Sequence, residues 1–495
     1  ACTALTNCVA AGPQAEVERR ARELAARLDA LGPAERAALP LFGLPFSVKE
    51  CYLLRGTDST AGLAGRVGVP SEEDAALVAQ LISLGAVPFC KTNVPQIMYA
   101  WECANQIYGV TSHPLHRCFI PGGSSGGEAA LIAAGGSVVG IGTDMGGSCR
   151  LPAHMSGCVG MKCTKGRVSV KGKGPPLLYG DGQQIIASCS GPLARTAEDL
   201  GFVLEKLCDP ASLEDVRRNW DSSVLPCPWN RIVAKGLEGQ QLKIGFYCYD
   251  GFMEASPACV RAVHKAVAAL KRAGVCCVEF CPPDVEEAFL IYAGLLATGL
   301  PHVQDLLARP GEHVADAIRK GIVAFSLPMW LKVLVTKLAG APVMEKVVRM
   351  ARAWSGAEYY ELVAAKMRYM DKFAKAFTSD LDLLLSPVHV LPTSAHMTTK
   401  DFPPTVCYTA LQNLLDYPAG VVPVTTLQPS DSAWDSPIRD KLLDPPIRRA
   451  YAQAIEANAP FPIGVQLVGR PYTEELVVRG MRELETALRA PQSLL

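Results

Sequence analysis

The segment Gly140–Arg150, GIGTDMGGSCR, constrains the fold more than any other part of the chain. It continues an apolar run, SVVGIGTD, that predicts a buried strand ending at Asp144. The glycines at positions 146 and 147 then let the backbone turn so that successive N–H groups point to one spot. Such a nest of amides is what a developing oxyanion needs, and Ser148 follows it directly on the exit turn.

Helix and strand patterns alternate along the rest of the chain and predict an α/β protein. Helical periodicity is found at residues 15–31, 74–86, 127–136 and 257–273, and over a long region, 285–375. Apolar runs predict strands at residues 43–50, 87–93, 137–144, 242–249, 275–280, 381–388, 419–426 and 464–470. No linker rich in Ser, Gly or Pro divides the 495 residues. We therefore expect one domain, 1–495, with 285–375 as a helical insertion.

The composition excludes some functions and favours others. Lysine plus arginine (48) equals aspartate plus glutamate (48), so the chain lacks the basic excess typical of nucleic-acid binding. Hydrophobic residues make up 49%, which favours some exposed apolar surface for a lipid or membrane. The eighteen cysteines do not have the spacing of a disulfide framework, which indicates free thiols in a reducing compartment. The eight histidines have no metal-ligand spacing, so we expect no metal.

Two features precede the Gly-Gly-Ser turn. The stretch Pro121–Glu128, PGGSSGGE, places a serine pair among glycines, and Lys49 lies in an apolar run. Amide hydrolysis needs a strong nucleophile, an oxyanion hole and a proton for the leaving nitrogen. A lysine can be the base, because burial favours its neutral form. Taken singly, Lys49 also fits a surface ion pair beside Glu50, and the glycine-rich stretches fit a flexible loop, an anion-binding nest or an ordinary turn.

In this order, the lysine, the serine pair and the serine after Gly-Gly resemble the amidase signature family, hydrolases with a Ser-Ser-Lys triad. The resemblance is firm over residues 44–167 and weaker in LLLSPV, DYPAGVVPVTT and PFPIGVQLVGRPYTEE. It implies a single α/β domain with one twisted mixed β-sheet flanked by helices on both sides. Cys163 and His113 depart from the family's usual residues, at positions that leave the triad untouched.

The resemblance assigns roles to three side chains. Ser148 would be the nucleophile, Lys49 the base, and Ser124, after a cis peptide bond, the group that passes protons between them. The backbone N–H groups expected to form the oxyanion hole belong to Met145, Gly146, Gly147 and Ser148. The residues expected to support the site, by bonding Ser124 or by holding the loop, are Ser125, Asp144 and Arg150.

Within the family, the chain is most similar to the branch that hydrolyses fatty acid amides. The similarity lies in TNVPQIMYAWECANQIYG, GGSSGGEAALIAAGGS and LLDYPAGVVPVTT. It implies that Met98 contacts the substrate and that Tyr99 and Trp101 line a channel for the acyl chain. Each methylene buried there would contribute about 0.8 kcal/mol. The alternative is that these three side chains are ordinary core.

Residues 324–338, AFSLPMWLKVLVTKL, carry only two charges, Lys332 and Lys337. Such a segment is too short to span a bilayer, but a tryptophan beside lysines suits one lying in the headgroup region. By resemblance, it would be a membrane-binding cap that admits lipids; a buried helix is the alternative. The side chains expected to face the membrane are Phe325, Leu327, Trp330, Leu331 and Leu334.

These observations predict a serine amidase that converts long-chain fatty acid amides, such as N-acylethanolamines and primary fatty amides, to fatty acid and amine without a cofactor. One alternative is a family enzyme for small amides, or a glutaminase subunit of an amidotransferase. Another is a non-catalytic lipid-binding scaffold on the same fold. The expected partners are a lipid amide, a membrane surface and a second copy of the chain, but no nucleic acid. We expect the protein to act at the cytosolic face of an intracellular membrane, and this expectation is compatible with an anchor segment that precedes Ala1.

Overall fold

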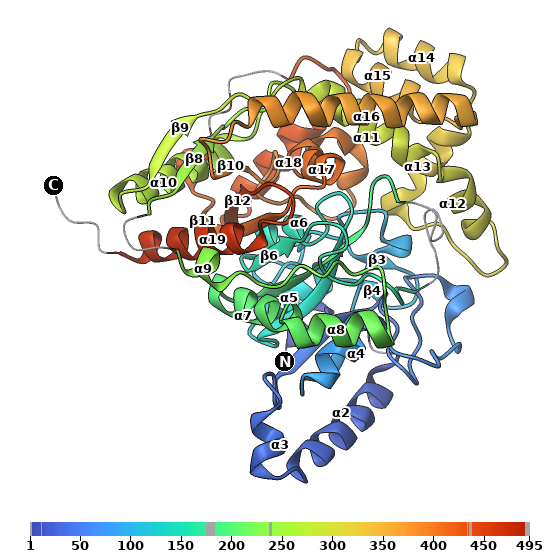
Figure 1. Ribbon diagram of the computed structural model, residues 1–495. Coiled ribbons are helices and arrows are strands. Elements are labelled where there is room, and N and C mark those ends of the chain that lie inside the picture. The colour runs from blue at the N-terminus through green and yellow to red at the C-terminus, as the bar shows by residue number, and fades with distance from the viewer. Residues whose placement is uncertain are drawn as a thin grey trace.

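One mixed sheet runs through the computed structural model, which describes residues 2–10, 12–174, 184–236, 240–432, 434 and 438–490. Within these ranges ten strands form it, in the order β2-β1-β5-β7-β6-β11-β12-β10-β8-β9, and helices cover both of its faces (Figure 1). This confirms the predicted fold class. The strands are β1 (Pro45–Lys49), β2 (Val87–Thr92), β5 (Val139–Asp144), β6 (Val159–Lys162), β7 (Cys189–Ala194), β8 (Lys243–Phe246), β9 (Cys276–Glu279), β10 (Leu383–Pro387), β11 (Ala419–Thr426) and β12 (Pro462–Val468), with a separate pair, β3 (Ala104–Asn105) and β4 (Gly109–Val110).

The sheet is parallel towards both edges and antiparallel between β5 and β10. Strand β1 pairs in parallel with β2 and β5, and β8 pairs in parallel with β9 and β10. In the β1–β5 pair Ser47 lies opposite Gly140. Parallel neighbours end at the same edge of a sheet. The last residues of β1 and β5, Lys49 and Asp144, are therefore brought to one place.

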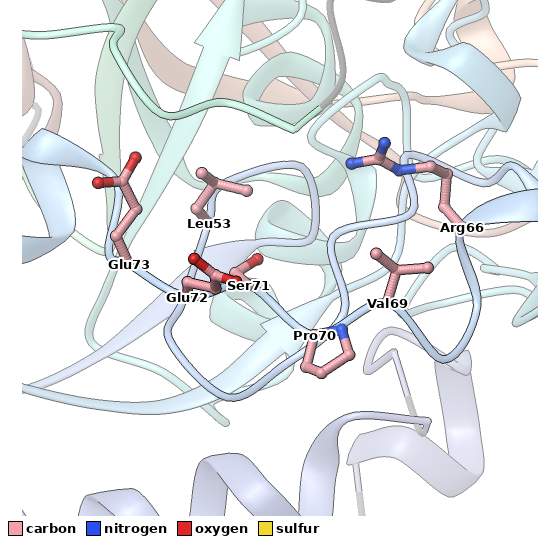
Figure 2. Close-up of a pocket in the computed structure, with 7 residues that line it drawn as sticks. All are labelled: Leu53, Arg66, Val69, Pro70, Ser71, Glu72 and Glu73. Carbon is pink, nitrogen blue, oxygen red and sulfur yellow. The ribbon is translucent and has the colours of Figure 1, made fainter.

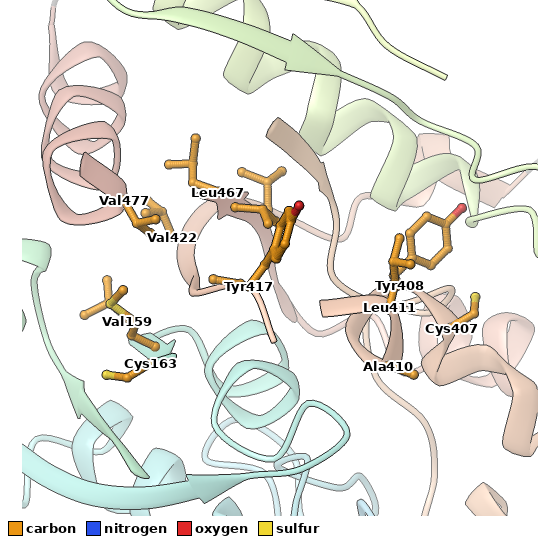
Figure 3. Packing of buried hydrophobic residues seen from close by; sticks show 14 of the residues in the cluster. Val159, Cys163, Cys407, Tyr408, Ala410, Leu411, Tyr417, Val422, Leu467 and Val477 are labelled. Carbon is orange, nitrogen blue, oxygen red and sulfur yellow. The ribbon is translucent and has the colours of Figure 1, made fainter. Parts of the chain in front are cut away.

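Two helical layers bury the sheet. Helices α7 (Ala197–Leu207), α10 (Pro257–Arg272) and α19 (Glu474–Arg489) pack on one face, and α5 (Gly126–Ala133), α6 (Arg150–Ser156) and α17 (Cys407–Leu415) lie on the other. Figure 3 shows Val477 of α19 beside Val422 and Leu467 of the sheet. Strands β5 and β12 are buried along their whole length, as expected for strands covered on both faces.

The remaining helices lie around this core. Between β9 and β10 the chain is helical, as predicted for residues 285–375, and Figure 1 draws these helices in yellow to orange. They are α11 (Val285–Ala297), α12 (Leu300–Leu307), α13 (Asp316–Ser326), α14 (Met329–Leu338), α15 (Pro342–Met350) and α16 (Gly356–Ala376). The other helices are α1 (Cys2–Thr6), α2 (Gln14–Asp29), α3 (Pro33–Ala37), α4 (Ala76–Ser83), α8 (Pro210–Asn219), α9 (Arg231–Lys235) and α18 (Asp444–Glu456).

The apolar segment 324–338 is divided between the end of α13 and α14, whose axes differ by 112°. The break follows from Pro328, because a proline disfavours the helical conformation of the residue before it, and Leu327 is extended (φ −72°, ψ 146°). In the part of the chain that the structure describes, no single helix is long and apolar enough to cross a membrane. The bent pair α13–α14 does meet that test, by length and composition only.

Candidate active site

Lys49 ends strand β1 and is completely buried. Its Nζ lies 2.8 Å from Ser124 Oγ and 2.8 Å from Thr143 Oγ1. The expected approach of Lys49 to Ser124 is therefore present. Thr143, near the end of β5, is a further partner that sequence reasoning missed. A buried amine held by two hydroxyl oxygens has a fixed position from which to exchange a proton with Ser124.

The serine pair lies in the loop that leads into α5. The Gly123–Ser124 peptide bond is cis, as the resemblance implied, and Ser124 is only 2% exposed. A Cβ at Gly123 would lie 2.8 Å from Trp101 Cα, so this position accommodates only glycine. The hydroxyl of Ser125 does not bond Ser124 as we expected. It contacts the backbone of Thr143 at 3.4 Å, because Ser124 is turned towards Lys49.

The Ser148 loop and the serine pair are joined through the backbone. The N–H of Ser125 donates to the carbonyl oxygen of Ser148 at 3.1 Å. Ser148 itself is half-buried, so a substrate can reach it. The link places the two serine loops side by side and explains how Ser125 supports the site without bonding Ser124 directly.

The turn before Ser148 needs its second glycine. Gly147 has φ +116°, and a Cβ there would lie 2.4 Å from Thr409 Oγ1. The N–H of Gly147 donates to Asp144 Oδ1 at 2.8 Å. This corrects the expectation that all four N–H groups of residues 145–148 face the substrate, because the carboxylate at the end of β5 engages one of them.

A buried ion pair holds the turn. Both oxygens of Asp144 accept from Arg150, at 3.0 Å each, and Oδ1 also accepts from Asn413 Nδ2 at 2.9 Å. Burial by itself would raise the pKa of Asp144, but the charge of Arg150 and these hydrogen bonds lower it well below the ordinary range. Arg150 also donates to Gln466 Oε1 at 3.1 Å. Asp144 and Arg150 thus hold the loop, and Asn413 and Gln466 are partners that the sequence did not reveal.

Two hydroxyl groups from distant helices bind the carbonyl groups of the same turn. Tyr292 Oη, on α11, donates to the Met145 carbonyl at 3.1 Å. Thr409 Oγ1, on α17, donates to the Gly146 carbonyl at 2.8 Å. Neither residue stands out in the sequence, although Thr409 precedes the DYPAGVVPVTT segment that carries part of the resemblance.

The expected substrate-contacting residues lie beside the serine loop. Ile97 and Met98 both have a left-handed backbone, with φ of +52° and +57°, and a β-branched residue such as Ile97 rarely adopts it. Strain of this kind occurs at functional sites, where the surrounding structure holds it. Tyr99 and Trp101 are half-buried and pack against the core. Their position fits both a channel lining and the core alternative.

The predicted cap residues differ in exposure. Leu327, Trp330 and Leu334 are exposed, Trp330 by 68%. Phe325 and Leu331 are half-buried and face the protein more than we expected.

A hollow of about 520 Å³ lies in the N-terminal part of the chain and is separate from the candidate site residues (Figure 2). It is lined by Leu53, Arg66, Val69, Pro70, Ser71, Glu72 and Glu73, none of which belongs to the candidate site. Over the described residues, no group of three or more His, Cys, Asp or Glu side chains has a geometry that could hold a metal ion.

Comparison with known proteins agrees with this geometry. The family described as Amidase matches residues 4–478. The chain is 34% identical to fatty acid amide hydrolase 1 of Caenorhabditis elegans over 461 residues, which cover 91% of this chain and 77% of that protein. It is 36% identical over 464 residues to fatty-acid amide hydrolase 1 of Sus scrofa, with 91% and 76% covered. A solved structure of fatty acid amide hydrolase has the same fold, with a TM-score of 0.81 over 99% of this chain and 80% of that one, at 24% identity. The chain therefore belongs to the amidase family and is an amide hydrolase.

Proposed function

We propose that this amide hydrolase cleaves long-chain fatty acid amides, with Ser148 as the nucleophile and Ser124 and Lys49 as its proton relay. The observation that carries the proposal is the 2.8 Å contact between the buried Lys49 Nζ and Ser124 Oγ. Lys49 Nζ also lies 2.8 Å from Thr143 Oγ1, so the buried amine is fixed within hydrogen-bond distance of Ser124. In its neutral form a lysine amine can accept a proton.

The first step is attack on the amide carbonyl. Ser148 Oγ forms a bond to the carbonyl carbon as its proton passes to Ser124, whose own proton passes to the neutral Lys49 amine. The carbonyl electron pair moves onto oxygen and gives a tetrahedral oxyanion. The backbone N–H groups of Met145, Gly146 and Ser148 stabilise this charge, while Gly147 anchors the turn through Asp144.

The second step expels the amine. The tetrahedral intermediate collapses, the carbon–nitrogen bond breaks, and a proton returns from Lys49 through Ser124 to the leaving nitrogen. Ser148 is left acylated. A water molecule then attacks the ester by the same relay and releases the fatty acid. Because a general base must be unprotonated to accept a proton, we expect the rate to rise from acid towards alkaline pH.

The substrate class is argued from exposed apolar surface. Leu327, Trp330 and Leu334 project from the bent pair α13–α14, as in segments that lie in a membrane interface. Lys337 of this segment is exposed, whereas Lys332 is buried and donates to the carbonyl groups of Phe325 and Ala351. The relatives named fatty acid amide hydrolase 1 favour the same class. We therefore propose that α13–α14 is a membrane-binding cap within the helical insertion 285–375, and that Tyr99 and Trp101 line the acyl channel beyond Met98.

The cellular setting is part of the proposal. The described cysteines are free thiols, three of them exposed (Cys118, Cys276 and Cys281), which suits the reducing cytosolic side of an intracellular membrane.

Homodimerisation stays a prediction, and analytical ultracentrifugation of the purified chain tests it.

Three variants test the relay. Ser148→Ala should abolish both hydrolysis and labelling by a fluorophosphonate probe. Lys49→Met should reduce the hydrolysis rate by roughly 10²-fold or more and flatten its rise towards alkaline pH. Ser124→Ala should also reduce the hydrolysis rate and flatten its rise towards alkaline pH. Unchanged labelling of Ser148→Ala would identify another nucleophile, and an unchanged pH profile for Lys49→Met would remove the lysine from the mechanism.

A graded panel of amides tests the substrate class, with acyl chains from two to twenty carbons and with or without anionic vesicles. We expect the kcat/KM value to rise with the length of the acyl chain. Vesicles should raise this value only for the long-chain amides. The double variant Trp330→Ser, Leu334→Ser should bind vesicles less, whereas Ile232→Ser, a matched control that is 64% exposed on α9, should not. A preference for short amides would instead favour a small-amide enzyme, and a preference for glutamine would favour a glutaminase subunit of an amidotransferase.

A further inference from the structure

The turn that carries the proposed oxyanion hole is fixed from two separate helices. Tyr292 donates to the Met145 carbonyl from α11, and Thr409 donates to the next carbonyl, that of Gly146, from α17. The two helices pack against each other. A Cβ at Gly146 would lie 2.4 Å from Tyr292 Oη, so the glycine makes room for the hydroxyl group. The glycine at position 146 and the packing of α11 therefore both allow Tyr292 to approach the turn closely.

Binding of the Met145 carbonyl has a geometric consequence. In a trans peptide the C=O and the following N–H point in opposite directions. When Tyr292 holds the Met145 carbonyl on one side, the Gly146 N–H is directed to the other side. Because the Gly147 N–H already donates to Asp144, the Gly146 N–H carries more of the oxyanion stabilisation than it would in a hole of four equivalent donors.

The tyrosine is suited to this task and unsuited to acid–base work. Tyr292 is 6% exposed, and burial, followed by the nearby Tyr99 and Asp144, raises its pKa well above the ordinary value. The hydroxyl group therefore stays protonated and remains a donor at any pH at which the enzyme works.

We propose that Tyr292 is a positioning residue of the oxyanion hole, whose hydroxyl group orients the Met145–Gly146 peptide so that its N–H faces the substrate carbonyl. This inference rests on the proposed function of Ser148. Tyr292 belongs to the helical insertion that also carries the α13–α14 cap, so the insertion contacts the catalytic turn directly. Its hydroxyl group touches the peptide and not the reacting atoms.

The test is Tyr292→Phe, with Tyr369→Phe as a matched control. Tyr369 is buried in α16 of the same helical segment, and its hydroxyl group donates to the Pro283 carbonyl at 2.6 Å. Both variants lose one buried hydroxyl group bound to a backbone carbonyl. We expect similar decreases in Tm. Only Tyr292→Phe should reduce kcat, by about tenfold, with KM within twofold of the wild type.

Two readouts separate positioning from general damage. The rate of Ser148 labelling by a fluorophosphonate should fall in Tyr292→Phe, because the phosphoryl oxygen occupies the same hole. Affinity for a long-chain acyl trifluoromethyl ketone, which Ser148 converts to an oxyanion, should fall about tenfold, while affinity for an unreactive ketone-free analogue of equal length should not.

The outcomes are distinct. Equal kcat and equal labelling rates in Tyr292→Phe and Tyr369→Phe would overturn the inference, and so would a rise of KM alone, which would mean that Tyr292 lines the substrate site. Wild-type protein that is labelled at Ser148 but cleaves no fatty amide would refute the proposed substrate, and the labelling comparison would still decide the role of Tyr292. No labelling of wild-type Ser148 would overturn both.

Discussion

Glu128 is a buried carboxyl group whose ionisation should contribute to the way stability depends on pH. It lies in α5 with no exposed surface and accepts hydrogen bonds from Ser47 at 2.5 Å and from Thr92 at 2.7 Å. Burial raises its pKa from 4.5 to about 7, although the two hydroxyl groups oppose the change. Its Oε2 occupies the space beside Gly140, where a Cβ would lie only 1.8 Å away.

The direction in which stability changes with pH follows from proton binding. Because the pKa is higher in the folded state, the folded chain binds more protons between pH 4.5 and 7. The contribution of Glu128 to stability is therefore complete below pH 4.5 and is lost as the pH rises to about 7. At about 1.36 kcal/mol per pH unit, this loss amounts to about 3 kcal/mol.

Glu128→Gln removes the titration and keeps the shape. The amide oxygen can still accept one hydroxyl proton, and the other hydroxyl group can rotate to accept from the amide nitrogen. We expect the unfolding free energy of the variant relative to the wild type to increase by about 3 kcal/mol between pH 4 and pH 8. Comparing the two proteins at each pH cancels the intrinsic cost of the substitution.

Urea denaturation followed by tryptophan fluorescence, at half-unit pH steps, measures the difference. Thr92→Val provides a second check, because loss of its hydrogen bond should raise the pKa of Glu128 further and extend the loss of stability above pH 7. If the difference between Glu128→Gln and the wild type stayed constant within about 1 kcal/mol across this range, the carboxyl group would ionise as it does in water and the reasoning would fail.

Three further substitutions probe the catalytic turn. Gly147→Ala forces a Cβ into the space of Thr409 at a left-handed φ, so we expect a loss of at least about 1 kcal/mol in urea denaturation and a large fall in kcat. Asn413→Ala removes one hydrogen-bond partner from Asp144 and one from Arg150, which keep their ion pair, and should cost about 1–3 kcal/mol, measured in the same way. Thr143→Val removes one of the two hydroxyl groups that hold Lys49, and steady-state kinetics should give a kcat lower by roughly tenfold with KM unchanged. Wild-type kinetics in this last variant would mean that Ser124 alone positions the lysine.

Two central strands illustrate what the sequence pattern did not reveal. Strands β6 and β7 stand between β5 and β11, yet neither was predicted. Strand β7, CSGPLA, has none of the β-branched residues that favour strands, and it contains Pro192, which usually argues against a central strand. A Cβ at Gly191 would lie 1.8 Å from the Met161 carbonyl oxygen, so the glycine is needed for the close approach of β6. Contact with neighbouring strands, rather than local propensity, determines this part of the sheet.

The sequence by itself determined the order of the motifs, most of the strands and helices, and the position of Lys49 in an apolar run. Those properties depend on residues that are close along the chain, so a local pattern records them. Only the tertiary structure decided which further groups hold the catalytic turn together with Asp144 and Arg150. Tyr292, Thr409 and Asn413 reach it from more than 140 positions away. Their hydrogen bonds exist because α11 and α17 pack beside the end of β5, and packing of that kind leaves no mark in a periodicity or a motif.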